Sequence, residues 1–150
     1  MVELCAALDE GVKLERESRS FYAAHAAKTP NTAVRSLLEM LAREEAEHER
    51  VLEALKRGAT CPINAAKALG AKAPKIGNVF SSEESGEYST MLLTAMSFEQ
   101  KTKEFYKAVA AAAQNSGEAK AFRELAAFEQ KHYDLLNSLY DELNYYRLQT

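Results

Sequence analysis

Two glutamate–histidine pairs interrupt leucine-rich helical patterns. In LAREEAEHERVLEAL, residues 41–55, Glu45 and His48 occupy positions where the alternating three- and four-residue spacing of the leucines predicts apolar side chains. Glu129 and His132 interrupt a second leucine-rich stretch in the same way. Carboxylates and imidazoles are ligands for divalent metal ions, and residues three apart share one face of a helix. The pattern indicates metal binding inside a helical core.

The other glutamates of residues 41–55 have a different predicted environment. Glu44, Glu47, Glu49 and Glu53 alternate with Arg43 and Arg50 and are expected to face water.

Two more glutamates lie on apolar helix faces. The residues Leu8, Glu15 and Tyr22 are seven apart, and so are Leu92, Glu99 and Tyr106. In an antiparallel hairpin, residues equidistant from the turn lie at one height. The midpoint of Glu15 and Glu45 is Pro30, and the midpoint of Glu99 and Glu129 is residue 114. Each pair is therefore expected about 22 Å from its turn, at one level of a bundle.

The chain also carries an internal repeat with an offset of 84 residues. The matched pairs include Glu15/Glu99, Phe21/Phe105, Tyr22/Tyr106, Asn31/Asn115, Glu45/Glu129, His48/His132 and Leu52/Leu136. Phe-Tyr pairs and histidines rarely match in one register by chance, so the halves are interpreted as two copies of one helical hairpin.

Composition predicts an all-α chain. Strong helix formers fill the stretches between three prolines and six glycines. We expect one domain, residues 1–150, with helices near 3–28, 31–57, 85–114 and 117–146. Asn31 or Thr32, and Asn115 or Ser116, could cap the second and fourth helices.

The middle of the chain is too long for an ordinary bundle turn. We expect hairpins 3–57 and 85–146 to be joined by a crossover, residues 58–84, that runs the length of the bundle, with a short helix near Ile63–Leu69.

Charge and cysteine usage exclude several classes of protein. A net charge of −3 without a basic block argues against nucleic acid as a partner, and no apolar run approaches the ~18 residues that a membrane span requires. The N-terminus does not resemble a signal peptide. Cys5 and Cys61 form no CxxC pair, so a zinc ribbon or disulfide framework is not expected. Free buried thiols and a cytoplasmic location are the expectation.

Four carboxylates and two imidazoles at one level of a core need compensating positive charge, because buried unpaired charges cost several kcal/mol. Two divalent cations would balance the four glutamates. The oxygen-rich ligand set favours iron or manganese over zinc. The alternative is that the six residues lie along a surface edge.

These motifs resemble the rubrerythrin branch of the ferritin-like superfamily. The resemblance rests on E-x5-FY in LERESRSFY (14–22) and FEQKTKEFY (98–106), and on E-x-x-H in EAEH (45–48) and EQKH (129–132). It covers all four helices. It implies a ferritin-like four-helix bundle that binds two iron ions, with manganese or zinc as substitutes.

The resemblance also implies roles for individual residues. Glu45 and Glu129 would bridge the two metals, His48 and His132 would each bind one, and Glu15 and Glu99 would be terminal or bridging ligands. Tyr22 and Tyr106 match a tyrosine that lies just outside the family's ligand set, with a redox or proton-donor role. They could equally be core aromatics whose hydroxyls bond a glutamate.

Two features depart from the family's pattern. Peroxide-reducing rubrerythrins carry an extra glutamate where this chain has Thr102, whose repeat counterpart is Ser18. They also carry a rubredoxin domain, and this chain has no CxxC to build one. The resemblance therefore implies poor peroxide turnover, or an external electron donor such as a rubredoxin-like protein.

The main hypothesis is a non-haem di-iron oxidoreductase of oxidative stress, which reduces hydrogen peroxide or dioxygen as Fe(II) is oxidised, in a chain expected to form a homodimer. The alternatives are oxygenation of an organic substrate reached through an apolar channel, iron storage or delivery in a cage, and a structural metal site. The sequence leaves the native metal, the oxidant and the reductant open.

Overall fold

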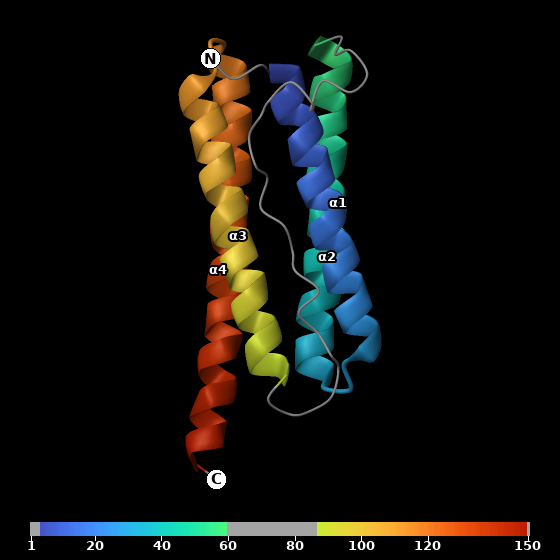
Figure 1. The fold of residues 1–150 in the computed structure, drawn as a ribbon. Coiled ribbons are helices and arrows are strands. Elements are labelled where there is room, and N and C mark those ends of the chain that lie inside the picture. Colours follow the sequence, from blue (N-terminus) through green and yellow to red (C-terminus); the bar gives the residue numbers. More distant parts are fainter. Residues whose placement is uncertain (1–3, 60–86, 150) are drawn as a thin grey trace.

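The chain forms two helical hairpins packed side by side. The computed structural model describes residues 4–59 and 87–149. The helices are α1 (Leu4–Lys28), α2 (Thr32–Ala59), α3 (Glu87–Ala112) and α4 (Ser116–Gln149). Helix α1 packs along α2 and α3 packs along α4 (Figure 1). No strand occurs within the described residues. The predicted all-α four-helix bundle is confirmed, and α4 continues beyond its predicted end at residue 146.

Asparagine side chains begin the second helix of each hairpin. Oδ1 of Asn31 accepts a hydrogen bond from the backbone N–H of Val34 at 3.0 Å. Oδ1 of Asn115 accepts from the backbone N–H groups of Gly117, at 2.7 Å, and Glu118, at 3.3 Å. Each cap satisfies backbone donors that the first turn of a helix leaves without partners. Of the two candidates predicted at each start, the asparagine is the cap.

The apolar core is divided into two clusters with a polar layer between them. The first cluster contains Ala7, Leu8, Val12, Leu52, Tyr106, Val109, Ala110, Phe122, Leu125 and Ala126. The second contains Tyr22, Ala26, Val34, Leu38, Leu41, Met91, Leu92, Ala95, Met96 and Leu136. All four helices contribute to both clusters. The residues between the clusters along each helix include the six glutamates and histidines identified in the sequence.

The first hairpin ends and the second begins at opposite ends of the bundle. Ala59, where α2 ends, and Glu87, where α3 begins, lie at opposite ends of the bundle (Figure 1). The predicted crossover, apart from residues 58 and 59 in α2, and the short helix expected near Ile63–Leu69 lie outside the described residues.

The expectation of free thiols is wrong for Cys5, which is disulfide-bonded. Cys61, the other cysteine of the chain, lies outside the described residues. Cysteine usage therefore carries no argument for a reducing compartment. None of the four described helices is both long enough and apolar enough to cross a membrane.

Candidate metal centre

The six predicted ligands meet in the polar layer. Their exposed fractions are 1% for Glu15, 1% for Glu45, 5% for His48, 0% for Glu99, 1% for Glu129 and 0% for His132. A surface edge would leave these side chains in water, so that alternative is wrong. We call these six residues the carboxylate–histidine cluster.

Helical spacing and turn position together bring the cluster to one level. On α2 and on α4, the glutamate and the histidine are three residues apart and share a face. On α1 and α3, a single glutamate replaces an apolar residue between buried Leu8 and Tyr22, and between buried Leu92 and Tyr106. Because the two hairpins are copies in one register, both contribute their polar residues at the same height.

The cluster divides into two groups of four. In the His48 group, made of Glu15, Glu45, His48 and Glu129, one ligand atom from each residue lies within 4.8 Å of the others. The same is true of the His132 group, made of Glu45, Glu99, Glu129 and His132. Glu45 and Glu129 belong to both groups. Each group draws on both hairpins and contains one histidine.

Hydrogen bonding tests whether this cluster fits metal ions. Every member has one buried atom without a hydrogen-bond partner in the described part of the chain: Glu15 Oε2, Glu45 Oε1, His48 Nδ1, Glu99 Oε2, Glu129 Oε1 and His132 Nδ1. Glu45 Oε1 and His132 Nδ1 are only 2.7 Å apart, yet they are not aligned as a hydrogen bond. Buried polar atoms are nearly always satisfied. Six buried oxygen and nitrogen atoms that lack hydrogen-bond partners, and that are of the kind that bind metals, lie together in one layer. They fit two divalent cations.

The pKa values of the cluster residues indicate how many of them carry protons when no metal is bound. Burial, reinforced by the neighbouring carboxylates, raises the pKa of Glu45 and of Glu129 well above the usual range. Burial lowers the pKa of His132, but the adjacent carboxylates of Glu129, Glu45 and Glu99 outweigh it, so that the pKa is raised. Burial also raises the pKa of Glu15, but its close neighbours Glu45 and His48 outweigh burial, so that the pKa is lowered. The metal-free cluster therefore holds protons that metal ions would displace.

Two tyrosines hydrogen-bond to the cluster across the hairpins. The hydroxyl of Tyr106 on α3 donates to Oε1 of Glu15 on α1 at 2.6 Å, and the hydroxyl of Tyr22 on α1 donates to Oε1 of Glu99 on α3. Both hydroxyls are buried. Burial raises the pKa of each tyrosine, and the glutamate that it bonds raises it further. Both side chains therefore remain neutral hydrogen-bond donors near neutral pH.

One residue that contacts the cluster was missed from the sequence. Oε2 of Glu44 on α2 lies 2.6 Å from Nε2 of His132 on α4. Glu44 was expected to face water, and its side chain is 43% exposed, but its carboxylate reaches a fully buried ring. A signal was present: the repeat counterpart of Glu44 is Phe128, so the repeat breaks directly beside a ligand position.

The other three glutamates expected on the water side do not contact the cluster. Glu47 is exposed and paired with Arg50. Glu49 is only 15% exposed and lies 3.3 Å from Arg16 and 3.4 Å from Arg19. Glu53 is half-buried and lies between Arg16 and Lys56. The last two therefore belong to the interface of α1 and α2.

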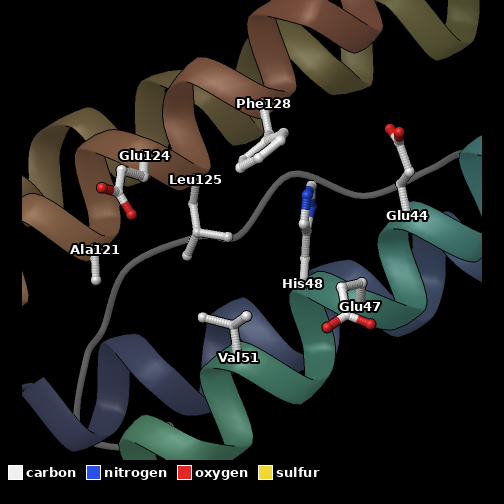
Figure 2. A pocket seen from close by; sticks show the side chains of 8 residues that line it. All are labelled: Glu44, Glu47, His48, Val51, Ala121, Glu124, Leu125 and Phe128. Carbon is white, nitrogen blue, oxygen red and sulfur yellow. The ribbon is translucent and has the colours of Figure 1, made fainter.

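A pocket of about 330 Å³ opens beside His48, between α2 and α4 (Figure 2). Its lining residues are Glu44, Glu47, His48, Val51, Ala121, Glu124, Leu125 and Phe128. The rings of His48 and Phe128 lie close together in its wall, with centroids 5.1 Å apart and planes tilted by 49°. The exposed surface of its wall is mostly apolar. This pocket leads from the surface to the His48 group.

Comparison with known proteins agrees with this site. Residues 90–148, which carry Glu99, Glu129 and His132, match the family model named Rubrerythrin. The structure is similar to that of a hypothetical protein from Pyrococcus furiosus, with a TM-score of 0.80 and 25% sequence identity over 96% of this chain and 92% of that chain. No protein with a curated description matches the chain. The rubrerythrin match indicates di-iron binding, and the cluster can hold metal. The resemblance to rubrerythrins is thus confirmed through the second hairpin.

Proposed function

We propose that the chain is a non-haem di-iron oxidoreductase whose metal ligands are the six residues of the carboxylate–histidine cluster. One observation carries the proposal. All six side chains are buried, and each has an oxygen or nitrogen atom without a hydrogen-bond partner among the described residues. The six residues form two groups that share Glu45 and Glu129. Two divalent cations would neutralise the four carboxylates. Glu45 and Glu129, which belong to both groups, would help to hold both ions, and Glu15 and Glu99 would each help to hold one.

When bound, two Fe(II) ions supply one electron each, and with two protons these reduce one hydrogen peroxide to two waters, or begin the reduction of dioxygen. The protein's residues prepare the site for this chemistry. The two apolar clusters enclose it, so that the charged groups lie in a medium of low polarity. The Tyr22 and Tyr106 hydroxyls hold Glu99 and Glu15 in place, and the pocket beside His48 gives a small oxidant a route inward.

Thr102 bears on the choice of oxidant. It is 2% exposed, and its hydroxyl has no hydrogen-bond partner within the described residues. A threonine supplies no carboxylate at the place where peroxide-reducing relatives carry one. Electrons for further turnovers would come from an external donor such as a rubredoxin-like protein. We therefore propose dioxygen or slowly reduced peroxide as the oxidant.

The proposal is tested by loading metal-free protein with Fe(II) under anaerobic conditions and then admitting oxygen or peroxide. The expected result is two irons per chain and the growth of visible absorption from ferric iron. A matched variant, Glu45→Gln with Glu129→Gln, should bind less than one iron per chain. Absence of binding by the wild-type chain would refute the proposal.

The pocket favours a second candidate function, the oxygenation of a small organic molecule. Its volume of about 330 Å³ and its walls of Val51, Leu125 and Phe128 suit an apolar compound, and His48 also lines it. An apolar ligand in this pocket should perturb the visible spectrum of the metal-loaded protein. Val51→Trp would fill the pocket and should abolish that perturbation without changing the metal content.

A further inference from the structure

The two histidines of the cluster have different surroundings on the side that faces away from the carboxylates. His132 points Nδ1 into the cluster, and its other ring nitrogen, Nε2, lies 2.6 Å from the carboxylate of Glu44. His48 also points Nδ1 into the cluster, 3.6 Å from Glu15 and 3.4 Å from Glu129. Behind His48 stands the ring of Phe128.

Glu44 and Phe128 are counterparts in the 84-residue repeat. The two hairpins thus place a carboxylate behind one histidine and an aromatic ring behind the other. The side chain of His132 is fully buried, whereas that of His48 is 6% exposed and lines the pocket. The rest of the cluster follows the repeat, so this pair of positions distinguishes the two groups.

A carboxylate behind a ligating histidine has a known physical effect. It accepts the proton of one ring nitrogen, which fixes the tautomer and leaves the lone pair on the other nitrogen for the metal. It also fixes the orientation of the ring and makes the ligand more basic. Losing such a partner weakens metal binding by about 10- to 100-fold. A phenyl ring can restrain an imidazole by packing, but it accepts no conventional hydrogen bond.

We propose that Glu44 is a positioning residue for His132, so that the two metal positions are unequal. The His132 group binds its metal ion more tightly and fills first, and the His48 group, which has Phe128 in place of the carboxylate, fills second. This inference rests on the proposed function, since it requires that the cluster holds metal. Beyond that function, the two metal positions fill in a fixed order, and Glu44, which is not one of the six ligands, sets this order.

The experiment is an anaerobic titration of metal-free protein with Co(II), in which calorimetry and visible absorption measure the binding at each addition. Wild-type protein should give two resolved binding constants. The tighter one should be lost in His132→Ala and kept in His48→Ala, which assigns it to the His132 group. The first equivalent of Co(II) should also produce a hyperfine-shifted, slowly exchanging imidazole N–H signal in the proton NMR spectrum, from Nε2–H of His132.

Glu44→Gln should weaken the tighter constant by about 10- to 100-fold, change the weaker constant by less than about threefold, and speed exchange of the shifted N–H signal. The matched control is Glu47→Gln, which makes the same charge change one helical turn away at an exposed residue that lines the same pocket. It should leave both constants unchanged. Phe128→Glu, at a position 43% exposed, should tighten the weaker constant and bring the two closer together.

Each outcome has one meaning. If wild-type protein binds no Co(II) in the cluster, the proposed function fails with the inference. If it binds two ions but Glu44→Gln behaves like Glu47→Gln, or weakens both constants equally, the proposed function stands and the positioning role of Glu44 is overturned. Thermal melting of the metal-free variants checks that each is folded, which the exposure of Glu44 and Phe128 leads us to expect.

Discussion

The Tyr106 hydroxyl on α3 donates a hydrogen bond to Oε1 of Glu15 on α1, 2.6 Å away, and the repeat reproduces this contact between Tyr22 and Glu99. Each bond joins one hairpin to the other. Each also satisfies one oxygen of a glutamate whose second oxygen is left for the metal. The pair therefore links assembly of the bundle to construction of the metal centre.

Replacing either tyrosine should weaken both the contact between the hairpins and the metal centre. Tyr106→Phe leaves Oε1 of Glu15 without its partner, and Tyr22→Phe does the same to Glu99. We expect each to lower the free energy of unfolding of the metal-loaded protein by about 1–3 kcal/mol, as measured by urea denaturation. The control is Tyr140→Phe, a half-buried tyrosine beside the second apolar cluster, which should change stability by less than about 0.5 kcal/mol. Equal effects in all three variants would contradict the linking role.

Replacing Glu45 with leucine, the type of residue that surrounds it on the apolar face of α2, should raise stability and abolish metal binding. Glu45→Leu replaces a buried carboxyl group, one oxygen of which has no hydrogen-bond partner in the described part of the chain, with an apolar side chain between Leu41 and Leu52. We expect the metal-free protein to become more stable by about 1–4 kcal/mol, in line with apolar replacement of other buried charges. Metal ions should no longer raise its melting temperature, because Glu45 belongs to both groups. Exposed Glu47→Leu is the control, and a destabilised metal-free Glu45→Leu protein would count against this prediction.

Metal binding should release protons and grow stronger with pH. The raised pKa values of Glu45, Glu129 and His132 mean that the native metal-free protein binds more protons than the unfolded chain. Its stability should therefore fall as pH rises above the ordinary glutamate value of 4.5, and further above the ordinary histidine value of 6.5. The lowered pKa of Glu15 acts in the opposite direction, but only below 4.5.

Metal ions replace these protons, so the gain in melting temperature on metal loading should widen between about pH 5.5 and 7.5. Melting curves at several pH values measure this gain. Calorimetric titration in buffers of different ionisation enthalpy counts the released protons. A gain that stays constant with pH would show that the cluster holds no displaceable protons.

The two asparagine caps should contribute similar amounts to stability. Asn31→Ala and Asn115→Ala each remove a side-chain acceptor for backbone N–H groups at a helix start. We expect each variant to lose about 1 kcal/mol of unfolding free energy in urea, with metal stoichiometry unchanged. The Gly variants at the same positions, which lose only a few tenths of a kcal/mol, serve as controls. Loss of metal together with either cap would mean that the turns, and not the helix faces, set the level of the cluster.

The sequence was sufficient to predict the helices and the six cluster residues because both depend on periodicity within a helix and on distance from a turn. Glu45 and His48 lie on the leucine face of α2, and no detail of packing is needed to place them there. Glu44 lies one residue outside that face. Its contact with His132 depends on how closely α2 approaches α4, which no pattern within α2 contains. The disulfide at Cys5 was also beyond prediction, because the spacing of cysteines along a chain does not show which of them pair.

Neither hairpin contains a complete group of ligands. The His48 group lacks only Glu129 in the first hairpin, and the His132 group lacks only Glu45 in the second. Two identical hairpins associating as separate chains could build a symmetric centre of this kind, but every substitution would then appear twice. A single continuous chain removes that constraint, so that Glu44 can occupy one half while Phe128 occupies the other. Joining the two halves in one chain thus allows the two metal positions to have different surroundings, which a symmetric assembly of identical chains does not allow.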